Sequence, residues 1–374
     1  MTTRRLILLS LVVLATLAAM PVHAAQSPKN VILMIGDGMG LAQVTLTRLS
    51  LDESSSPLNM DAMRYTAFAK THSANATVTD SGAAATALAT GFKTNNGMIS
   101  TLPDGTQVQT ILEAATKLRK ATGLVTTTTI THATPAAFGA HVEARKAEAD
   151  IAVQYVEKKI DVLLGGGRMF FIPKSQEKSK REDERDLLAE AKSAGYTFVD
   201  ARDGLLAATG NKLLGLFRMG SLTTKSPEPT LAELTDKAIE ILSGDRDGFF
   251  LVVEGGQIDW TCHNNDAPGT VKQMFDFDAA IGKALDFARK QGDTLVVVTA
   301  DHETGGLSII YPDKDSNARF KTAWATKGHS GCSVPVFADG PGADLFTGVL
   351  DNTDVPKKIA RLWEIKGFAR QMSP

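Results

Sequence analysis

Cysteine is nearly absent from this sequence, since Cys262 and Cys332 are the only two among 374 residues. So small a number excludes a domain that is held together by a network of disulfides. Neither sign of charge predominates, because 40 basic residues face 42 acidic ones and the formal net charge is -2. This balance argues against a nucleic-acid-binding protein that depends on bulk positive charge, although it leaves room for a local basic patch.

Long apolar runs are lacking after residue 24, and the one before it is typical of a secretory signal. Arg4 and Arg5 give a basic start, the segment 6–19 is almost entirely apolar, and the segment 22–24 fits a small-residue cleavage site. We predict that residues 1–24 are a cleaved signal peptide and that the mature protein is exported, either to the periplasm or out of the cell. An uncleaved membrane anchor is the alternative, but the run is short for a spanning helix.

The composition, with 43% hydrophobic and 22% charged residues, is typical of a soluble globular protein. Short apolar runs predict buried strands at Val31–Ile35, Gly123–Val125, Val162–Leu164, Phe249–Val253 and Leu295–Val298. Helix-length segments lie between them, including Val108–Lys120, Leu231–Leu242 and Val271–Gln291. This alternation predicts an α/β fold, a three-layer α/β/α sandwich with a large, mostly parallel central sheet.

No linker or internal repeat divides the chain, so we expect a single α/β domain over residues 25–374. We expect a surface elaboration of this domain at roughly residues 165–245. It contains the segment 173–185, the most polar stretch of the chain, which we interpret as a solvated loop that leads into a helix.

Acidic residues and histidines follow the predicted strands at the points where the strands end. The set comprises Asp37 after the first strand, His132 and Thr134 after the second, Glu254, Asp259 and His263 at the fourth, and Asp301 and His302 after the fifth. Ligands of open α/β sheets bind beyond the carboxyl ends of the strands, so we expect these groups to converge. Carboxylates gathered in one cleft repel one another, and bound cations relieve that repulsion.

The ligand types and two spacings support a metal-site hypothesis. Oxygen and imidazole donors without thiolate pairs suit zinc at the Asp/His positions and magnesium at all-oxygen positions. Asp259 and His263 are four residues apart and share a face on one helical turn. Asp301 and His302 are adjacent, so both reach one site only if the backbone turns where the strand ends. His329 precedes another apolar run and completes the candidate set.

Each of these residues also has an ordinary structural interpretation. A single aspartate at a strand end is commonly a turn residue or a helix cap, and a single histidine is commonly a core or surface residue. His72 and His141 keep that interpretation. The functional interpretation therefore depends on the agreement of four strand ends rather than on any one of them.

Ser81 begins the most alanine-rich segment of the chain. The segment 79–91 predicts a short helix with Asp80 or Ser81 as its N-cap and Gly91 as its end. The N–H groups and the positive dipole end of such a helix suit a phosphate or another tetrahedral oxyanion. Beside a metal ion, a serine hydroxyl ionises without a histidine base. An ordinary helix cap is the alternative interpretation of these residues.

Seven segments, in order, resemble the alkaline phosphatase family. They are residues 30–40 (NVILMIGDGMG), 78–91 (VTDSGAAATALATG), 130–145 (ITHATPAAFGAHVEAR), 161–168 (DVLLGGGR), 249–263 (FFLVVEGGQIDWTCH), 298–306 (VTADHETGG) and 328–331 (GHSG). The resemblance implies a secreted bacterial enzyme with an alkaline-phosphatase-like fold. Its implied activity is metal-dependent hydrolysis of phosphate monoesters to an alcohol and inorganic phosphate, with an alkaline pH optimum.

The resemblance also implies a role for each candidate residue. Ser81 would become phosphorylated during turnover, Arg145 would grip two phosphate oxygens, and Asp80 would position Arg145 or support the loop of Ser81. The implied metal ligands are Asp259, His263 and His329 for one zinc ion, Asp37, Asp301 and His302 for a second zinc ion next to Ser81, and Asp37, Thr134 and Glu254 for a third ion, usually magnesium, with His132 nearby. Relatives are commonly homodimers, so a dimer is a family expectation.

The chain departs from some bacterial members of the family at two positions. Those members have aspartate where this chain has His132 and lysine where it has Trp260, a residue that the resemblance places beside the substrate. The change puts the identity of the third metal in doubt and removes a positive charge near the phosphate, which favours faster product release. The chain is also short for the family, so we expect that large crown-type insertions are reduced or absent.

The two cysteines adjoin implied zinc ligands, since Cys262 precedes His263 and Cys332 follows His329 by three residues. We therefore expect the two thiols to lie close together. A disulfide and a pair of buried free thiols are the alternatives, and the demanding geometry of a disulfide favours the free thiols.

Two rival functions differ from a phosphomonoesterase. A phosphodiesterase or sulfatase of the wider superfamily would use a similar two-metal edge, but Arg145 and the segment 131–134 favour the monoesterase. A periplasmic metal- or phosphate-binding protein without turnover would give no reason for a serine at a helix tip beside a metal site. We expect small phosphate monoesters as substrates, and neither nucleic-acid-specific binding nor membrane attachment after signal cleavage.

Overall fold

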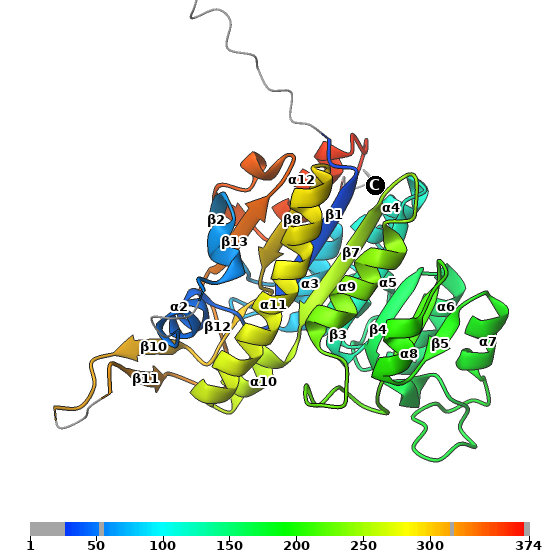
Figure 1. The fold of residues 1–374 in the computed structure, drawn as a ribbon, viewed down its shortest axis with the longest axis horizontal. Helices are drawn as coiled ribbons and strands as arrows, with labels where there is room; N and C mark the ends of the chain where they lie inside the picture. Colours follow the sequence, from blue (N-terminus) through cyan, green and yellow to red (C-terminus); the bar gives the residue numbers. More distant parts are fainter. Residues whose placement is uncertain (1–26, 52–55, 315–317, 370–374) are drawn as a thin grey trace, which may run out of the picture.

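The computed structural model describes residues 27–51, 56–314 and 318–369. The predicted signal peptide, residues 1–24, lies outside the described residues. The described part is built around one ten-stranded sheet with helices on both faces (Figure 1). The predicted α/β/α sandwich with a large, mostly parallel central sheet is therefore confirmed.

The central sheet has the strand order β14-β2-β13-β8-β1-β7-β3-β4-β6-β5. Its strands are β1 (Asn30–Gly36), β2 (Tyr65–Lys70), β3 (Ala121–Thr129), β4 (Val162–Gly166), β5 (Thr197–Val199), β6 (Leu213–Leu216), β7 (Phe249–Gly255), β8 (Thr294–Thr299), β13 (Val334–Asp339) and β14 (Gly348–Asp351). All neighbours from β8 to β5 pair in parallel, whereas β13 runs antiparallel to both β8 and β2. Two small antiparallel sheets lie outside it, β9 (Glu303–Thr304) with β12 (His329–Ser330) and β10 (Leu307–Ile310) with β11 (Lys321–Trp324).

The helices form the two outer layers. Helices α9 (Leu231–Leu242) and α11 (Ala267–Gln291) pack against each other over one face of the sheet. Behind the sheet in Figure 1 lie α3 (Ser81–Thr90), α4 (Ile111–Lys117) and α5 (Ala133–Gly139), with α12 (Asp354–Leu362) packed on α3 and α4. The remaining helices are α2 (Leu41–Leu49), α6 (Glu148–Lys158), α7 (Leu187–Ser193), α8 (Arg202–Ala207) and α10 (Gln257–His263), with short 3-10 turns at Asn59–Ala62, Arg168–Phe170 and Ala343–Leu345.

The centre of the sheet explains why its strands are unbroken apolar runs in the sequence. All seven residues of β1 are buried, and β7 and β8 pair with it on either side. A parallel strand that is covered on both faces has no solvated side, so both of its faces require apolar side chains. The five predicted strands are all present, and α9 has the predicted bounds, fixed by a capping box between Thr230 and Glu233.

The region from residue 165 to 245 contributes to the sheet as well as to the surface. Strands β5 and β6 extend the sheet beyond β4, and α9 covers one of its faces. The polar segment 173–185 is a loop that leads into α7, as predicted. Its Arg181 is nevertheless buried, because the guanidinium pairs with Asp183 and donates to the carbonyl oxygens of Ala149 and Phe170. The single-domain division stays a prediction.

None of the described helices combines the length and the apolar character that crossing a bilayer requires.

Candidate metal centre

The carboxyl ends of three adjacent strands define one edge of the sheet. Strand β1 ends at Gly36, directly before Asp37, and Glu254 of β7 pairs with Ile35 of β1 in the register of the sheet. On the other side of β1, strand β8 ends at Thr299, two residues before Asp301. Parallel register therefore brings Asp37 together with two carboxylates that lie more than two hundred residues further along the chain.

Three groups of side chains at this edge have donor atoms close enough to share an ion. In each group, the ligand atoms all lie within 4.8 Å of one another. The groups are Asp37 with Asp301 and His302, Asp37 with His132 and Glu254, and Asp259 with His302 and His329. Asp37 and His302 each belong to two groups, so the three form one continuous cluster.

Four buried carboxylate oxygens of this cluster fit a cation because they have no hydrogen-bond partner among the described residues. Asp37 is fully buried, and neither of its carboxylate oxygens accepts a hydrogen bond from the described residues. The same holds for Oδ2 of Asp301 and Oε1 of Glu254. Buried polar atoms are otherwise almost always satisfied, and an unpaired buried carboxylate is costly. Divalent cations supply what these oxygens lack, and the Asp/His donor set suits zinc and magnesium.

The same crowding shifts the pKa values of the carboxyl groups. Burial, reinforced by repulsion from Asp301, Asp259 and Glu254, raises the pKa of Asp37 well above its usual range. Burial raises the pKa of Glu254 to about 7, although hydrogen bonds from the hydroxyls of Thr126 and Thr128 oppose the shift. Without cations, these groups hold protons that a bound metal would displace.

The carboxylates that contact histidines shift the other way. Burial raises the pKa of Asp259, but contacts with His263, His302 and Thr304 outweigh it and hold that pKa below the usual value. Burial likewise opposes the ionisation of Asp301, yet the adjacent His302 lowers its pKa. Neighbouring groups with opposite shifts are typical of functional sites.

The candidate histidines have distinct environments. Burial lowers the pKa of His302, but Asp301 outweighs it and raises that pKa; Nε2 of His302 lies 3.1 Å from Oδ2 of Asp301. The hydrogen bond to Asp259 raises the pKa of His263 to about 9. Burial and the stacked ring of His302 lower the pKa of His329. Burial and the charge of Arg145 lower the pKa of His132 to about 4, so that its ring is neutral and its Nδ1 has no partner among the described residues.

His263 differs from the other predicted ligands in its placement. The structure puts it on α10 with Asp259, as the four-residue spacing predicts, and its Nε2 lies 3.2 Å from Oδ2 of Asp259. The close group around Asp259 nevertheless contains His302 and His329 instead of His263. The assignment of His263 to this metal group stays a prediction.

Ser81 lies at the same edge of the sheet, but it belongs to α3, in the layer of helices that contains α4 and α5. It is the first residue of α3, and Asp80 is the N-cap, whose carboxylate accepts from the backbone N–H of Ala83 at 3.0 Å. Gly91 ends α3 in a left-handed conformation, as predicted. Ser81 is 3% exposed, and its hydroxyl lies 3.2 Å from Nε2 of His302. Serine, helix N-terminus and metal ligands thus meet at one point.

Arg145 lies beside this serine on the same side of the site. Its Nη1 donates to Oδ2 of Asp80 at 2.9 Å, and its Nη2 lies 3.4 Å from Nε2 of His132. Burial raises the pKa of Asp80, but the Ala83 N–H and the Arg145 guanidinium outweigh it and lower that pKa. Trp260 approaches from α10, with its ring edge-on to that of His132 at 6.3 Å between centroids.

Several residues of the site escaped the sequence analysis. The Glu254 carboxylate accepts from the hydroxyls of Thr126 and Thr128, which lie near the carboxyl end of the threonine-rich strand β3. Glu303 is buried and accepts from the side chains of Gln43 and Ser330. The position of Glu303 directly after Asp301-His302 is a signal in the sequence, whereas the threonine run of β3 gave no indication of a partner.

The two cysteines differ in burial, contrary to one expectation from the sequence. Both are free thiols, but Cys262 is buried and Cys332 is exposed, so the expectation that both are buried is wrong for Cys332. Cys332 lies in the exposed segment between β12 and β13. His72 and His141 are absent from the metal groups found in the described residues, and His141 instead pairs with Glu113 and Ser100.

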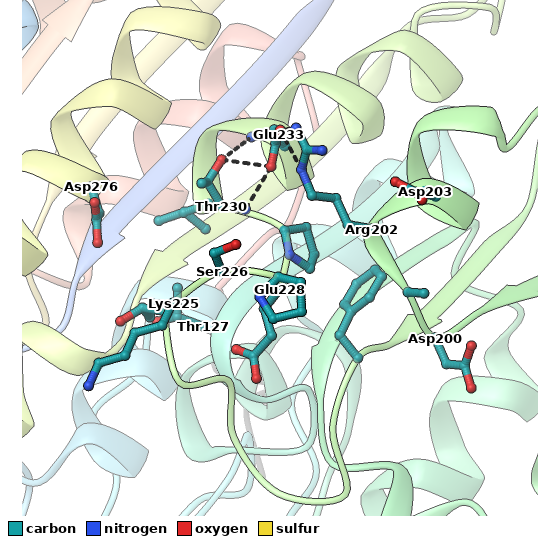
Figure 2. Close-up of a pocket in the computed structure, with 16 residues that line it drawn as sticks. Thr127, Asp200, Arg202, Asp203, Lys225, Ser226, Glu228, Thr230, Glu233 and Asp276 are labelled. Carbon is teal, nitrogen blue, oxygen red and sulfur yellow. Dashed lines mark hydrogen bonds and ion pairs between the residues drawn. The ribbon is translucent and has the colours of Figure 1, made fainter.

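A pocket of about 560 Å³ lies near the start of α9 (Figure 2). Its lining includes none of the candidate site residues. Figure 2 shows Arg202 directed at Glu233, with which it forms an ion pair, and Glu233 in turn belongs to the capping box of α9. The Arg202–Glu233 pair of this pocket is thus satisfied within the protein, unlike the unpaired carboxylate oxygens of the metal edge.

The fold and this arrangement together are those of an α/β metallohydrolase with a serine at its metal centre. Comparisons with known proteins agree with this class. The family model described as alkaline phosphatase matches residues 28–317 and 310–365. Alkaline phosphatase 3 of Bacillus subtilis is 37% identical over 417 residues, which cover 88% of this chain and 88% of that protein.

Solved structures give the same result. Alkaline phosphatase from the Antarctic bacterium TAB5 has a TM-score of 0.83 at 38% identity and covers 90% of this chain and 99% of its own. A TAB5 variant with a histidine replaced by aspartate, which has Mg bound in its M3 site, has a TM-score of 0.81 at 36% identity and covers 91% and 99%. The chain belongs to the alkaline phosphatase family, and it is a phosphomonoesterase.

Proposed function

We propose that this enzyme hydrolyses phosphate monoesters by double displacement, with Ser81 as the nucleophile. The observation that carries the proposal is the position of the Ser81 hydroxyl, 3.2 Å from His302 Nε2 and at the N-terminus of α3. A serine at this point meets both an array of backbone N–H groups and the edge where buried carboxylates lack partners.

The donor sets fit two zinc ions and one magnesium ion. Zinc would be held by Asp259, His263 and His329 in one site and by Asp37, Asp301 and His302 in the other. When bound, the zinc ions supply the positive charge that stabilises the Ser81 alkoxide, a hydroxide and the departing alkoxide.

The third site would take magnesium. Its ligands would be Asp37, Thr134 and Glu254, all of them fully buried. The neutral ring of His132, whose Nδ1 has no partner among the described residues, would lie beside the ion. The magnesium in the M3 site of the TAB5 variant supports an ion of this kind in the family.

The chain's own residues would share the work of phosphoryl transfer. In the first step, Oγ of Ser81 attacks phosphorus in line, the Oγ–P bond forms, and the P–O bond to the alcohol breaks. In the second step, a hydroxide attacks phosphoserine, the Oγ–P bond breaks, and inorganic phosphate leaves. Backbone N–H groups of the first turn of α3 and the Arg145 guanidinium bind the equatorial oxygens.

Asp80 would act through Arg145. Its carboxylate already caps α3 and accepts from Nη1 of Arg145, so it holds the guanidinium beside Ser81. The planar fork of Arg145 would then bind two phosphate oxygens, which a lysine could not copy. Trp260, half-buried at the mouth of the site, would line the substrate without adding charge. Activity should rise into alkaline pH, because the alkoxide and hydroxide forms are the reactive ones.

Trapping of a covalent phosphate tests the proposal. Wild-type enzyme mixed with labelled phosphate monoester and quenched in acid should carry label on Ser81. Ser81→Ala should carry none and lose activity by about 10³-fold or more. Ser243→Ala, at the exposed end of α9, is the matched control and should behave as wild type. Full activity in Ser81→Ala would contradict the proposal.

Export and assembly belong to the same proposal. We infer that residues 1–24 are removed on export to the periplasm or the medium and that the mature chain forms a homodimer. N-terminal sequencing of the protein recovered from outside the cytoplasm tests the first point, and its mass in solution tests the second. An intact N-terminus or a monomer would contradict the corresponding part.

A further inference from the structure

Thr304 is a fully buried residue of β9 that the mechanism above does not use. It pairs with His329 across the two strands β9 and β12, and its backbone N–H donates to the carbonyl oxygen of Gly38 at 3.3 Å. Thr304 therefore lies between three segments that carry proposed metal ligands: the loop of Asp37, the turn after β8, and strand β12.

The Thr304 hydroxyl contacts one proposed ligand of each zinc site. Its Oγ1 donates to Oδ1 of Asp259 at 2.5 Å and lies 3.2 Å from Nδ1 of His302. A hydroxyl has one proton to donate, and a carboxylate only accepts, so this proton belongs to the bond with Asp259. The hydroxyl is then the acceptor toward His302, and Nδ1 of His302 must carry the hydrogen.

This arrangement determines which ring nitrogen of His302 is available to a metal. With a hydrogen on Nδ1, the lone pair of a neutral ring is on Nε2. That nitrogen faces the metal edge, 3.2 Å from Oγ of Ser81 and 3.1 Å from Oδ2 of Asp301. Metal-binding histidines commonly have their second nitrogen fixed by such a partner.

The loop that contains Gly38 packs closely against the Thr304 hydroxyl and restricts its orientation. Gly38 has a φ of +77°, and a Cβ at this position would lie 2.9 Å from Oγ1 of Thr304 and 2.8 Å from Cα of Asp259. The loop after β1 thus lies directly against Thr304 and Asp259, and only glycine allows this approach.

We propose that Thr304 is a positioning residue that serves both zinc sites at once: its single hydroxyl fixes the tautomer of His302 and the orientation of Asp259. The inference rests on the proposed metal-dependent function. It assigns the hydroxyl a role that does not require contact with substrate.

Two substitutions at this position distinguish the effect of losing the hydroxyl from the effect of changing the volume of the side chain. Thr304→Val keeps the shape and removes both hydrogen bonds, whereas Thr304→Ser keeps the hydroxyl. Zinc affinity, measured by competition with a chromogenic chelator, should fall about 10- to 100-fold in Thr304→Val. It should return close to the wild-type value in Thr304→Ser.

Thr235→Val is the matched control for the loss of a buried hydroxyl. Thr235 is fully buried in α9, where its hydroxyl donates to the carbonyl oxygen of Leu231 at 2.7 Å. This variant should lower thermal stability without changing zinc affinity. An equal loss of zinc affinity in Thr235→Val and Thr304→Val would mean that destabilisation alone explains the effect, and the inference would be overturned.

A spectroscopic readout tests the tautomer directly. In zinc-loaded protein with ¹⁵N-labelled histidine, Nδ1 of His302 should carry a proton that exchanges slowly with water. In Thr304→Val this proton loses its acceptor and should exchange faster, while Thr304→Ser should restore the slow exchange. A metal-bound Nδ1 in the wild type would overturn the inference.

The outcomes distinguish this inference from the proposed function. Equal zinc affinity in wild type, Thr304→Val and Thr304→Ser would overturn the positioning role and leave the phosphatase mechanism intact. A wild-type protein that binds no zinc at all would overturn both, and the wild-type titration alone would reveal it.

Discussion

Two regions of the molecule contain buried charged residues: the metal edge, at the carboxyl ends of β1, β7 and β8, and the outer part of the sheet around β4, β6 and β5. They differ in whether the protein itself supplies partners for those charges. At the metal edge, Asp37 is fully buried and neither of its oxygens accepts a hydrogen bond from the described residues. In the outer part, the buried Arg181 has a carboxylate partner and two carbonyl oxygens. A buried charge whose partners lie within the protein requires no further ligand, whereas buried carboxylate oxygens without a hydrogen-bond partner fit a bound cation.

The same contrast between satisfied and unsatisfied carboxylates exists within the site, between Glu303 and Asp37. Like the proposed carboxylate ligands, Glu303 is buried, but each of its two oxygens accepts two hydrogen bonds. Oε1 accepts from Gln43 and Leu307, and Oε2 accepts from Gly306 and Ser330. Burial and charge alone therefore do not identify a metal ligand, and the unpaired oxygens of Asp37 distinguish it from Glu303.

The largest expected effect on activity comes from replacing an aspartate by asparagine at the metal edge, compared with the same replacement in the outer part. Asp37→Asn removes a charge shared by two metal groups and should reduce kcat/KM for nitrophenyl phosphate by about 10³-fold or more. Asp183→Asn should leave kcat/KM unchanged and lower the unfolding temperature slightly, because buried Arg181 loses its charged partner. Similar activity losses in the two variants would break the comparison.

A smaller effect is expected from two glycines with left-handed backbones. Gly38→Ala places a Cβ against Asp259 and Thr304, and we expect zinc affinity to fall about 10- to 100-fold. Gly195→Ala, between α7 and β5, has a φ of +92° and no atom within 4 Å of the new Cβ. Both variants carry a backbone strain of about 1–2 kcal/mol, so equal zinc affinities would show that the contact with Asp259 is unimportant.

The pH dependence of the metal-free protein should show the smallest effect. Burial raises the pKa of Glu254 from 4.5 to about 7, so the folded state binds this proton more tightly than the unfolded chain. Its contribution to stability is therefore fully present below about pH 4.5 and lost as pH rises through about 7. The raised pKa of Asp37 acts in the same direction.

Thermal unfolding across pH 4 to 8, with and without metal, checks this prediction. The unfolding temperature of the metal-free protein should fall over this range relative to that of the loaded protein, and Glu254→Gln should reduce the fall. A metal-free protein whose stability is independent of pH over this range, or rises, would contradict the electrostatic account.

The sequence predicts the centre of the fold well because its strands are buried on both faces. Local signals are sufficient to predict these elements: apolar runs for β1, β7 and β8, and capping residues for α3 and α9. The outer strands β5 and β6 are only three and four residues long, too short for such a signal. Strand β2 alternates between exposed and buried residues at the antiparallel margin of the sheet and was not predicted.

The candidate ligands were predictable because strand ends share one edge, and the resemblance implied the group of Asp37, Asp301 and His302 that the structure shows. The grouping of His302 with Asp259 and His329 was not predicted. His302 lies between Asp37 and Asp259 and stacks on His329 at 3.5 Å between centroids, a placement that depends on tertiary packing. Thr304 was missed for the same reason. Its hydroxyl acts on Asp259, 45 residues away in the chain, and no local pattern reports that contact.

Metal content measured together with activity tests the central claim most directly. The purified mature protein should contain zinc and magnesium by elemental analysis, lose phosphomonoesterase activity when a chelator removes them, and regain it on refilling with both ions. Full activity in a preparation without bound divalent metal would contradict the account.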